Sequence, residues 1–402
     1  MKIAVDARTM ASRPSGVGNY LSDFLKALFQ RKEFDVILIC DVAESEAIRF
    51  FLGHSVPVFC YGKRVFRSAG VFAYFSYVRK ILLSEKPDCF WEPNNLFPFP
   101  LTGFHGKVIL AVHDLFPITM PQYYSRRYRF YFRTCIRMSL KQADAVLYNS
   151  QETKRVTEEY FPFLKQKSSF VSYLIVPKPP AKEVIDEGFF LYIGNLEKRK
   201  GTDLLLNAWC SYREKGGERP LYLAGNIREK GIAALLHEAE GRFADLHYLG
   251  YVTDEEKYDL LSRCHCFVFP SRAEGFGLPP LEAVGYGKPV LTSDLSVFRE
   301  VLGDDILTFP IDKGENRQMQ ILSQILLDEH VWSKKLTNHK NYNYAEVLGR
   351  YIPETLSERL ATFFYEIVYS GSRPFEDRNG SKSKERRHKD TGKRKVRIQN
   401  YE

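Results

Sequence analysis

The chain has 402 residues, which is more than one hydrophobic core usually holds, so about two domains are expected. Its 44% hydrophobic and 27% charged residues are ordinary for a globular protein, and no apolar run approaches the roughly 18 residues of a membrane span. The strand-like segment directly after Lys2 leaves no room for a secretory signal, and seven scattered cysteines do not form a disulfide framework. We therefore expect a cytoplasmic protein.

The net charge of +9 is concentrated at the C-terminus. Residues 371–402 contain eleven Lys and Arg against five Asp and Glu, and they are nearly without apolar side chains. Such a segment cannot bury a core and is expected to be disordered. Three roles remain open for this tail: a solvated extension, an electrostatic anchor on anionic lipid, or a nucleic-acid-binding segment.

The first half opens with a strand over residues 2–6. A turn containing Gly16 and Gly18 follows, and apolar residues at helical spacing then predict a helix over 21–29. Glycines in a turn let backbone N–H groups approach a ligand closely. A lone Gly-x-Gly is a weak signal, but its place after the first strand makes the two glycines candidate site residues.

A second candidate site follows the strand predicted over 108–112. His113 and Asp114 come directly after this strand, behind the proline-rich stretch 92–100. Ligands bind at the carboxyl ends of strands in open α/β sheets, so both side chains are candidate ligands. Further strands are predicted at 36–40, 145–148, 221–224, 267–269 and 290–292.

Residues 123–141 mix arginines with aromatic side chains on a predicted helix. Such a helix can lie on an anionic membrane surface. It can equally be a packed helix with a basic face toward solvent, and the sequence does not separate the two.

The second half begins after a proline-rich linker at 176–182. A strand over 189–193 leads to the loop 194–201, and a helix over 204–209 follows. The repetition of strand, glycine loop and helix predicts an α/β fold with one parallel sheet in each half. Arg199 and Lys200 in this loop are placed to stabilise the negative charge of a leaving group; a solvated charge run is the plainer alternative.

The segment 267–282 carries the strongest signal. A buried strand is followed by Glu274-Gly-Phe-Gly, and Pro279 and Pro280 then suit the first turn of a helix that contains Glu282. Backbone N–H groups at a glycine loop and helix start bind anions, whereas the two carboxylates are repelled by phosphate and suit neutral hydroxyls. Phosphate together with hydroxyls describes a nucleotide sugar.

This segment, EGFGLPPLEAVGYGKPVLTSD, closely resembles the E-x7-E signature of the GT4-type retaining glycosyltransferases, which have the GT-B fold. The resemblance extends over about residues 1–365. It implies two Rossmann-like parallel-sheet domains facing across a cleft. The corresponding domain prediction has an acceptor-side domain at 1–175, a nucleotide-sugar domain at 188–350, a helix at 351–370 that returns to the first domain, and the disordered basic tail at 371–402.

The resemblance also implies roles for individual residues. Glu274 would contact the donor sugar, Glu282 the ribose, and His113 the sugar from across the cleft. Arg199 and Lys200 match the family's cationic loop. The remaining donor-side residues are backbone or loop positions: Gly16, Gly18, Gly194, Asn195, Phe276, Gly277 and Leu278. Asp114 is expected to orient groups on the acceptor side. Many members have arginine where this chain has Asn195, so it is open whether Arg199 supplies the missing cation.

We therefore predict a retaining glycosyltransferase that moves a hexose from a nucleotide diphosphate sugar to an acceptor hydroxyl. The opening residues resemble members that transfer mannose in surface-polysaccharide assembly, which favours mannose. No cofactor or metal is expected, since the Asp-x-Asp motif occurs nowhere in the chain. Expected partners are the donor, a glycan or lipid-linked glycan acceptor, and an anionic membrane surface on the inner face of the plasma membrane, but no nucleic acid.

Two rival functions remain at this stage. The first is a glycoside hydrolase that uses Glu274 and Glu282 as acid and base. The second is a non-catalytic binding protein with the same fold that acts through its basic tail. Binding of a nucleoside diphosphate argues against the hydrolase, and deletion of residues 371–402 tests the binding protein.

Overall fold

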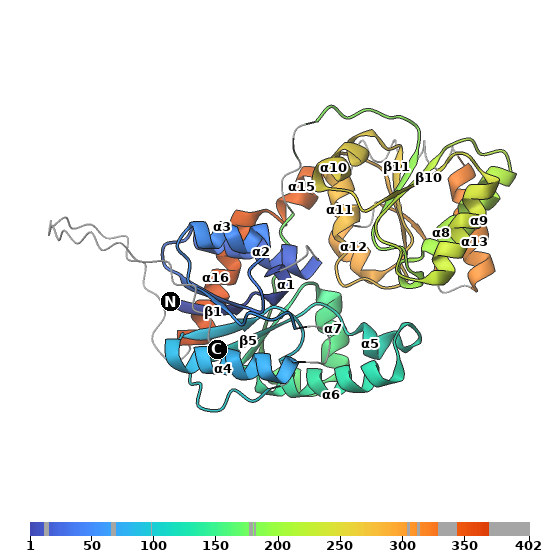
Figure 1. Cartoon of the computed structure of the whole chain (residues 1–402). Coiled ribbons are helices and arrows are strands. Elements are labelled where there is room, and N and C mark those ends of the chain that lie inside the picture. The colour runs from blue at the N-terminus through green and yellow to red at the C-terminus, as the bar shows by residue number, and fades with distance from the viewer. Residues whose placement is uncertain are drawn as a thin grey trace.

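The computed structural model shows two α/β lobes, each built on a parallel sheet (Figure 1). The C-terminal tail, and with it the expected disorder, lies outside the described residues. The structure describes residues 1–11, 16–65, 70–97, 99–176, 180, 182–303, 306–311, 314–328 and 344–369.

The first sheet has seven parallel strands in the order β3-β2-β1-β4-β5-β6-β7. Its central strands are runs of apolar residues, as expected where helices cover both faces of a sheet. The chain order reverses between β1 and β4, the place where open α/β sheets form a ligand crevice. The strands are β1 (Lys2–Asp6), β2 (Asp35–Cys40), β3 (Val58–Cys60), β4 (Cys89–Glu92), β5 (Lys107–Val112), β6 (Ala145–Tyr148) and β7 (Ser168–Val171).

Seven α-helices and two short 3-10 helices are described between these strands and on the sheet's two faces. They are α1 (Arg8–Ala11), α2 (Gly16–Phe29), α3 (Glu46–Gly53), α4 (Val71–Glu85), α5 (Phe116–Thr119), η1 (Pro121–Tyr123), α6 (Arg126–Gln142), α7 (Gln151–Tyr160) and η2 (Pro162–Gln166). None of the described helices is long and apolar enough to cross a membrane.

The second sheet has six parallel strands in the order β10-β9-β8-β11-β12-β13. Here the order reverses between β8 and β11, so the loops that follow these two strands emerge side by side. The strands are β8 (Phe190–Ile193), β9 (Leu221–Ala224), β10 (Leu246–Gly250), β11 (Cys266–Phe269), β12 (Val290–Ser293) and β13 (Leu307–Phe309). The helical segments are η3 (Lys198–Lys200), α8 (Thr202–Glu214), α9 (Lys230–Arg242), α10 (Asp254–Arg263), α11 (Leu278–Gly285), α12 (Ser296–Leu302), α13 (Glu315–Leu327) and α15 (Tyr344–Gly349).

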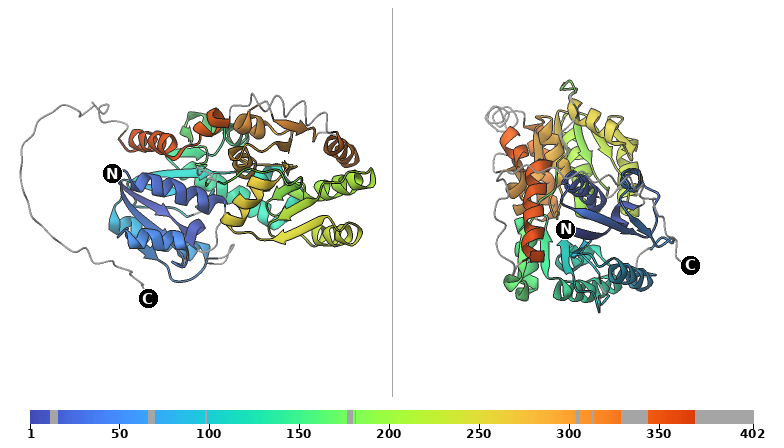
Figure 2. Two further views of the ribbon diagram at one scale, coloured as in Figure 1. Left: turned by 90° about the horizontal axis from the view of Figure 1, so that it is seen from above. Right: turned by 90° about the vertical axis from the view of Figure 1, so that its left-hand side faces the viewer.

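The last described helix, α16 (Pro353–Tyr369), lies on the first lobe rather than on the second (Figures 1 and 2). It packs against α2, and the Phe364 ring meets the Trp91 ring of β4 at 5.4 Å between centroids. The chain therefore crosses between the lobes twice within its described part.

The predicted fold class is confirmed, and so are the eight strands predicted from the sequence. One local prediction is wrong. Gly16 and Gly18 do not form a turn before the helix, because α2 already begins at Gly16. The two glycines therefore lie in the first turn of a helix.

Candidate active site

The loops after β8 and β11 are joined by contacts that only their glycines permit. A Cβ atom on Gly201 would lie 1.9 Å from the carbonyl oxygen of Pro270. The Arg272 N–H donates to the carbonyl of Arg199 at 2.8 Å, which ties one loop to the other. The cationic loop and the glycine loop therefore form one surface.

On this surface Lys200 and Glu274 form an ion pair. The Lys200 Nζ lies 2.6 Å from the Glu274 Oε1, and the two side chains are 17% and 7% exposed. A carboxylate buried to this degree is costly unless it is paired. The two residues assigned to the leaving group and the donor sugar thus hold one another.

Arg199 is engaged on three sides. Its Nη1 donates to the carbonyl of Ala273 at 3.0 Å, its Nη2 pairs with Glu197 at 2.5 Å, and its guanidinium lies 5.0 Å from the ring centroid of Phe116. Phe116 belongs to the first lobe, so Arg199 spans the cleft.

Gly194 and Asn195, the two residues directly after β8, contact neither Lys200 nor Glu274 through a hydrogen bond given for the described residues, and Asn195 has a partner of its own. Gly194 and Asn195 are half-buried, and the Asn195 Oδ1 accepts a hydrogen bond from the Arg228 Nε at 3.2 Å. Arg228 thus places a guanidinium beside the position that carries arginine in many members of the family that the sequence resembles. Sequence reasoning missed Arg228 because it follows a different strand, β9.

The glycine loop ends in a helix start that suits an anion. Gly277 adopts φ 93°, and a Cβ atom there would lie 2.5 Å from the Phe298 ring. Phe276 is buried against Tyr351, so only its backbone can face a ligand. Leu278 opens α11, and Pro279 and Pro280 in the first turn have no N–H group. The anion-binding element expected from the sequence is therefore reduced to the N–H groups of Gly277, Leu278 and Leu281.

Glu282 lies on α11 in a separate cavity of about 690 Å³ between the lobes, which Gly18 and Leu278 also line. Its Oε1 is 2.8 Å from the Lys257 Nζ, and burial raises its pKa although Lys257 opposes the shift. The described wall holds five carboxylates and two lysines. Because carboxylates outnumber lysines, the wall of this cavity suits the neutral hydroxyls of a ligand better than its phosphate groups.

His113 follows β5 and is 8% exposed. Its Nε2 lies 2.7 Å from the carbonyl oxygen of Pro93, and because a carbonyl only accepts, Nε2 carries the proton. Burial lowers the pKa of the imidazole to about 4. His113 is therefore neutral near pH 7, with Nδ1 as its remaining acceptor.

Asp114 lines a smaller cavity of about 180 Å³ together with Glu274. Its Oδ1 accepts the Phe116 N–H at 3.1 Å and so orders the start of α5. Burial raises its pKa, while the nearby charges of Arg199 and Lys200 pull the pKa down. Asp114 therefore lies close to Arg199, Lys200 and Glu274 of the second lobe.

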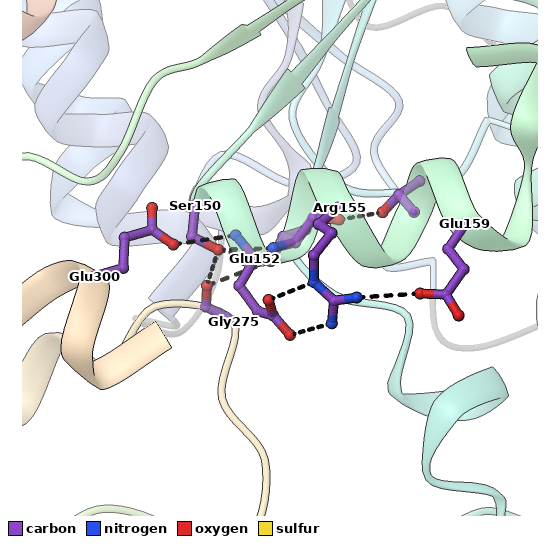
Figure 3. Close-up of polar contacts among 8 residues, drawn as sticks. Ser150, Glu152, Arg155, Glu159, Gly275 and Glu300 are labelled. Atoms are coloured by element: carbon purple, nitrogen blue, oxygen red, sulfur yellow. Dashed lines mark hydrogen bonds and ion pairs between the residues drawn. The ribbon is translucent and has the colours of Figure 1, made fainter. Parts of the chain in front are cut away.

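The lobes meet directly at His113 and Gly275. A Cβ atom on Gly275 would lie 2.3 Å from the carbonyl oxygen of His113. The Ser150 Oγ donates to the carbonyl of Gly275 at 2.8 Å (Figure 3). The Asn149 Nδ2 donates to the carbonyl of His113 at 3.0 Å. The two residues directly before α7 thereby fix His113 relative to the residue beside Glu274.

Glu300 on α12 completes this contact. Its two carboxylate oxygens accept the N–H groups of Gln151 and Glu152 at 2.7 and 3.0 Å (Figure 3). A carboxylate at a helix N-terminus is stabilised by the free N–H groups and the helix dipole. Here the cap comes from the other lobe, a pairing that no local sequence pattern reveals.

The structure therefore brings together Lys200, Arg199, Glu274, Asp114 and His113 in one region, and Gly18, Leu278 and Glu282 in the neighbouring cavity. Gly16 lines neither of these two cavities. The site assignments themselves remain predictions.

Asp23 is a cleft residue that sequence reasoning missed. It lies on α2 in the cavity of Glu282, and burial raises its pKa from 3.8 to about 6, with Lys26 opposing the shift and Asp254 adding to it. It went unnoticed because a carboxylate on an amphipathic helix is normally solvated.

Asp23 gives the ligand-free protein a pH-dependent stability. Since its pKa is raised on folding, its favourable contribution is present at low pH and is lost as the pH rises through about 6. We expect Asp23→Asn to raise the melting temperature by a few degrees at pH 8, with a smaller gain at pH 5. Glu44→Gln, at a 55% exposed position in the same cavity, is the control. Equal gains at both pH values would contradict the prediction.

Two family models match nearly the whole described part of the chain. Residues 14–172 match the model described as Glycosyltransferase Family 4, and residues 178–345 match that described as Glycosyl transferases group 1. The chain belongs to the GT4-type glycosyltransferases. In this glycosyltransferase the first model covers the lobe of His113, and the second covers the lobe of Glu274.

Several relatives of this glycosyltransferase act in O-antigen synthesis. The O-antigen chain mannosyltransferase B of Escherichia coli is 30% identical over 226 residues, which are 53% of this chain and 58% of that protein. The serotype-specific mannosyltransferase WbdA of Escherichia coli is 26% identical over 250 residues, which are 57% of this chain and 30% of that protein. The aligned part thus spans less than two thirds of either relative.

Solved structures agree on the fold. HepE of Anabaena, in complex with UDP and glucose, has a TM-score of 0.69 at 17% identity over 90% of this chain and 98% of that one. WaaG, a glycosyltransferase involved in lipopolysaccharide biosynthesis, has a TM-score of 0.64 at 15% identity over 90% of this chain and 99% of that one. At these identities the likeness shows that the glycosyltransferase has the GT-B architecture.

Proposed function

We propose that the chain transfers a hexose, with mannose favoured, from a nucleotide diphosphate sugar to an acceptor hydroxyl during assembly of a surface polysaccharide. The observation that carries this proposal is the paired Lys200 and Glu274 at the mouth of two joined glycine loops, held opposite His113 and Asp114 by the Gly275 contact. The mannosyltransferase relatives support the choice of sugar.

In the proposed reaction the second lobe holds the donor. The N–H groups at the start of α11 and the cation of Lys200 take the diphosphate, and the carboxylate of Glu282 takes the ribose hydroxyls. As the bond to the anomeric carbon breaks, negative charge moves onto the diphosphate, where fixed cations lower the barrier. Lys200 thus leaves Glu274 when the donor enters, and Glu274 becomes free to bind sugar hydroxyls.

The first lobe supplies the opposite wall. His113 is neutral and acts as a hydrogen-bond partner rather than as an acid. No side chain is assigned as a covalent nucleophile, and the family's account, in which a donor phosphate oxygen accepts the acceptor's proton on the same face, implies retention. We further propose that the transfer reaction needs no metal ion.

The arrangement does not favour the glycoside hydrolase. Glu274 and Glu282 line different cavities, and each is paired with a lysine. An acid and base pair must instead flank one glycosidic bond. The role of the basic tail remains a prediction, because the tail lies outside the described residues.

The face of α6 supports a peripheral position on anionic membrane. Its arginines 126, 127, 129, 133 and 137 are exposed, and Phe130 among them is 76% exposed. Apolar and basic side chains on one exposed face are the pattern of an interfacial helix. We include this surface in the proposal as the place where a lipid-linked acceptor is met.

The experiment that tests the function is a transfer assay. The full chain is incubated with UDP-, GDP- and ADP-hexoses and a mannose-terminated acceptor, and the product is examined by proton NMR. One base should give transfer with the donor's anomeric configuration. Inversion would contradict the retaining mechanism, and failure with every donor would contradict the function.

Chelation tests the metal-free part of the proposal separately. We expect EDTA, at concentrations that remove Mg²⁺ and Mn²⁺, to leave the transfer rate within about twofold, since cations of the chain take the diphosphate. The assay is repeated after adding Mn²⁺ back. A loss of activity that Mn²⁺ restores would show that a metal does this work.

A further inference from the structure

All seven cysteines of the chain are free thiols, and two of them lie opposite each other in the first sheet. Cys40 ends β2 and Cys60 ends β3, and the strand register pairs the two residues directly. Neighbouring strands lie about 4.8 Å apart, within the range of roughly 4.4–6.8 Å between the Cα atoms of bridged cysteines. In the described strands, Cys89 and Cys266 face no cysteine across the sheet.

The two thiols are on the same face of the sheet. Side chains alternate between the two faces along a strand. Cys40 and Cys60 both belong to the core cluster that contains the apolar side chains of α2 and α3, whereas Ile39 and Phe59 pack on the opposite face. The thiols of Cys40 and Cys60 share a hydrogen bond. The packing of β2 and β3 therefore holds two sulfur atoms in contact.

The two thiols differ in how far they can be reached. Cys40 is 0% exposed, whereas Cys60 is 8% exposed because β3 is the edge strand of the sheet. In its thiol form Cys60 donates to the carbonyl oxygen of Asp41 at 3.6 Å, which fixes the direction of its side chain. A small oxidant therefore meets Cys60 first, with Cys40 directly behind it.

The thiols also differ in acidity. The hydrogen bond from the Cys40 thiol lowers the pKa of Cys60 to about 7, and the Gly62 N–H adds to this shift. Burial and the carboxylates of Asp41 and Glu44 oppose it. The same hydrogen bond and burial raise the pKa of Cys40, which keeps its proton near neutral pH. Cys60 is thus the thiolate of the pair, and the thiolate is the nucleophilic form of cysteine.

An acidic, accessible cysteine beside a second thiol is the arrangement of a cysteine that is oxidised reversibly. We propose that Cys40 and Cys60 form a modification site at which hydrogen peroxide makes a reversible disulfide, with Cys60 as the attacking thiol and Cys40 as the resolving thiol. This site goes beyond the proposed function, because it involves neither the donor nor the acceptor.

The reaction has two steps. The Cys60 sulfur attacks one peroxide oxygen and the O–O bond breaks, so that a sulfenic acid forms and the leaving hydroxide takes the Cys60 proton to become water. The Cys40 sulfur then attacks the sulfur of the sulfenic acid, whose hydroxyl leaves as water with the Cys40 proton. The two thiols are oxidised to one disulfide, and one peroxide is reduced to two molecules of water.

The site adjoins the wall of the cavity that contains Glu282. Asp41 follows Cys40 directly, and Glu44 and Ser45 of the same segment line this cavity. The disulfide would tie the edge strand β3 to the strand that leads into this wall.

The test treats the full chain with hydrogen peroxide slightly above neutral pH and follows the thiols by intact mass and peptide mapping. The wild type should lose the mass of two hydrogen atoms, with Cys40 joined to Cys60, and dithiothreitol should restore both thiols. Cys40→Ser should stop at a sulfenic acid on Cys60, which dimedone traps. Cys60→Ser should leave Cys40 reduced, because Cys40 is 0% exposed.

The matched control is Cys210→Ser. Cys210 on α8 is 8% exposed, like Cys60, but burial raises its pKa. The substitution should leave the disulfide and its rate of formation unchanged, and in the wild type Cys210 should react at least about ten-fold more slowly than Cys60, since it has far less thiolate.

The peptide map of the wild type decides the outcome without any variant that serine could destabilise. Oxidation of the wild type without a bond between Cys40 and Cys60 would overturn the proposal. Equal rates at Cys210 and Cys60, or a folded Cys40→Ser variant without a sulfenic acid on Cys60, would overturn it as well.

Discussion

Replacing Lys200 by Met is expected to lower kcat by about 100- to 1,000-fold, the usual effect of removing one group that stabilises transition-state charge. Methionine keeps an unbranched side chain, one atom shorter than that of lysine, but removes the cation that pairs with Glu274 at 2.6 Å. The measurement is a steady-state transfer assay with saturating donor. Thermal unfolding should show destabilisation as well, because the 7% exposed carboxylate of Glu274 is left unpaired.

The double variant Lys200→Met with Glu274→Gln separates catalysis from stability. Neutralising both partners removes the unpaired charge, so the melting temperature should recover toward that of the wild type. Activity should stay low, because neither the cation for the diphosphate nor the carboxylate for the sugar is restored. Recovery of activity together with stability would mean that the ion pair serves folding alone.

Gly275→Ala is expected to lower kcat/KM by about 100-fold or more without unfolding either lobe. The added Cβ atom would lie 2.3 Å from the backbone carbonyl oxygen of His113. Because this is a backbone atom, no side-chain rotation can relieve the clash. The lobes must separate slightly, which moves Glu274 away from His113. A displacement of about 1 Å at reacting groups is enough for such a loss.

The matched control is Gly231→Ala on α9, where an added Cβ atom has no neighbour within 4 Å. It should leave activity unchanged. The melting temperature of Gly275→Ala should fall only slightly, because the clash lies between lobes rather than within a core. Wild-type activity in Gly275→Ala would show that the contact of His113 with Gly275 does not set the geometry of the cleft.

The parallel-sheet architecture could be predicted from the sequence because local signals determine it. Buried strands such as 145–148 and 221–224 are short apolar runs with clear ends, and their predicted bounds are those observed. The start of α11 could be predicted because Gly277 suits the left-handed backbone before it, and Pro279 and Pro280 suit the first turn of a helix.

Elements with weaker local signals were missed. Strand β4 has only four residues and ends in Glu92, a carboxylate that no strand pattern predicts to be fully buried. The glycines of α2 were assigned to a turn because glycine lowers helix propensity, but the helix is stabilised by burying Tyr20, Phe24 and other apolar side chains.

Contacts between distant segments could not be predicted at all. The cap that Glu300 provides for α7 and the contact of Gly275 with His113 both depend on how the two lobes pack against each other. These are also the contacts that set the geometry of the cleft.

The most direct test of the central claim is a crystal structure of the chain with the nucleotide sugar that it turns over. We predict that the Lys200 Nζ leaves Glu274 and lies within hydrogen-bond distance of a diphosphate oxygen, with Glu274 on the sugar and Glu282 on the ribose. A donor bound elsewhere while the pair of Lys200 and Glu274 stays intact would contradict the account.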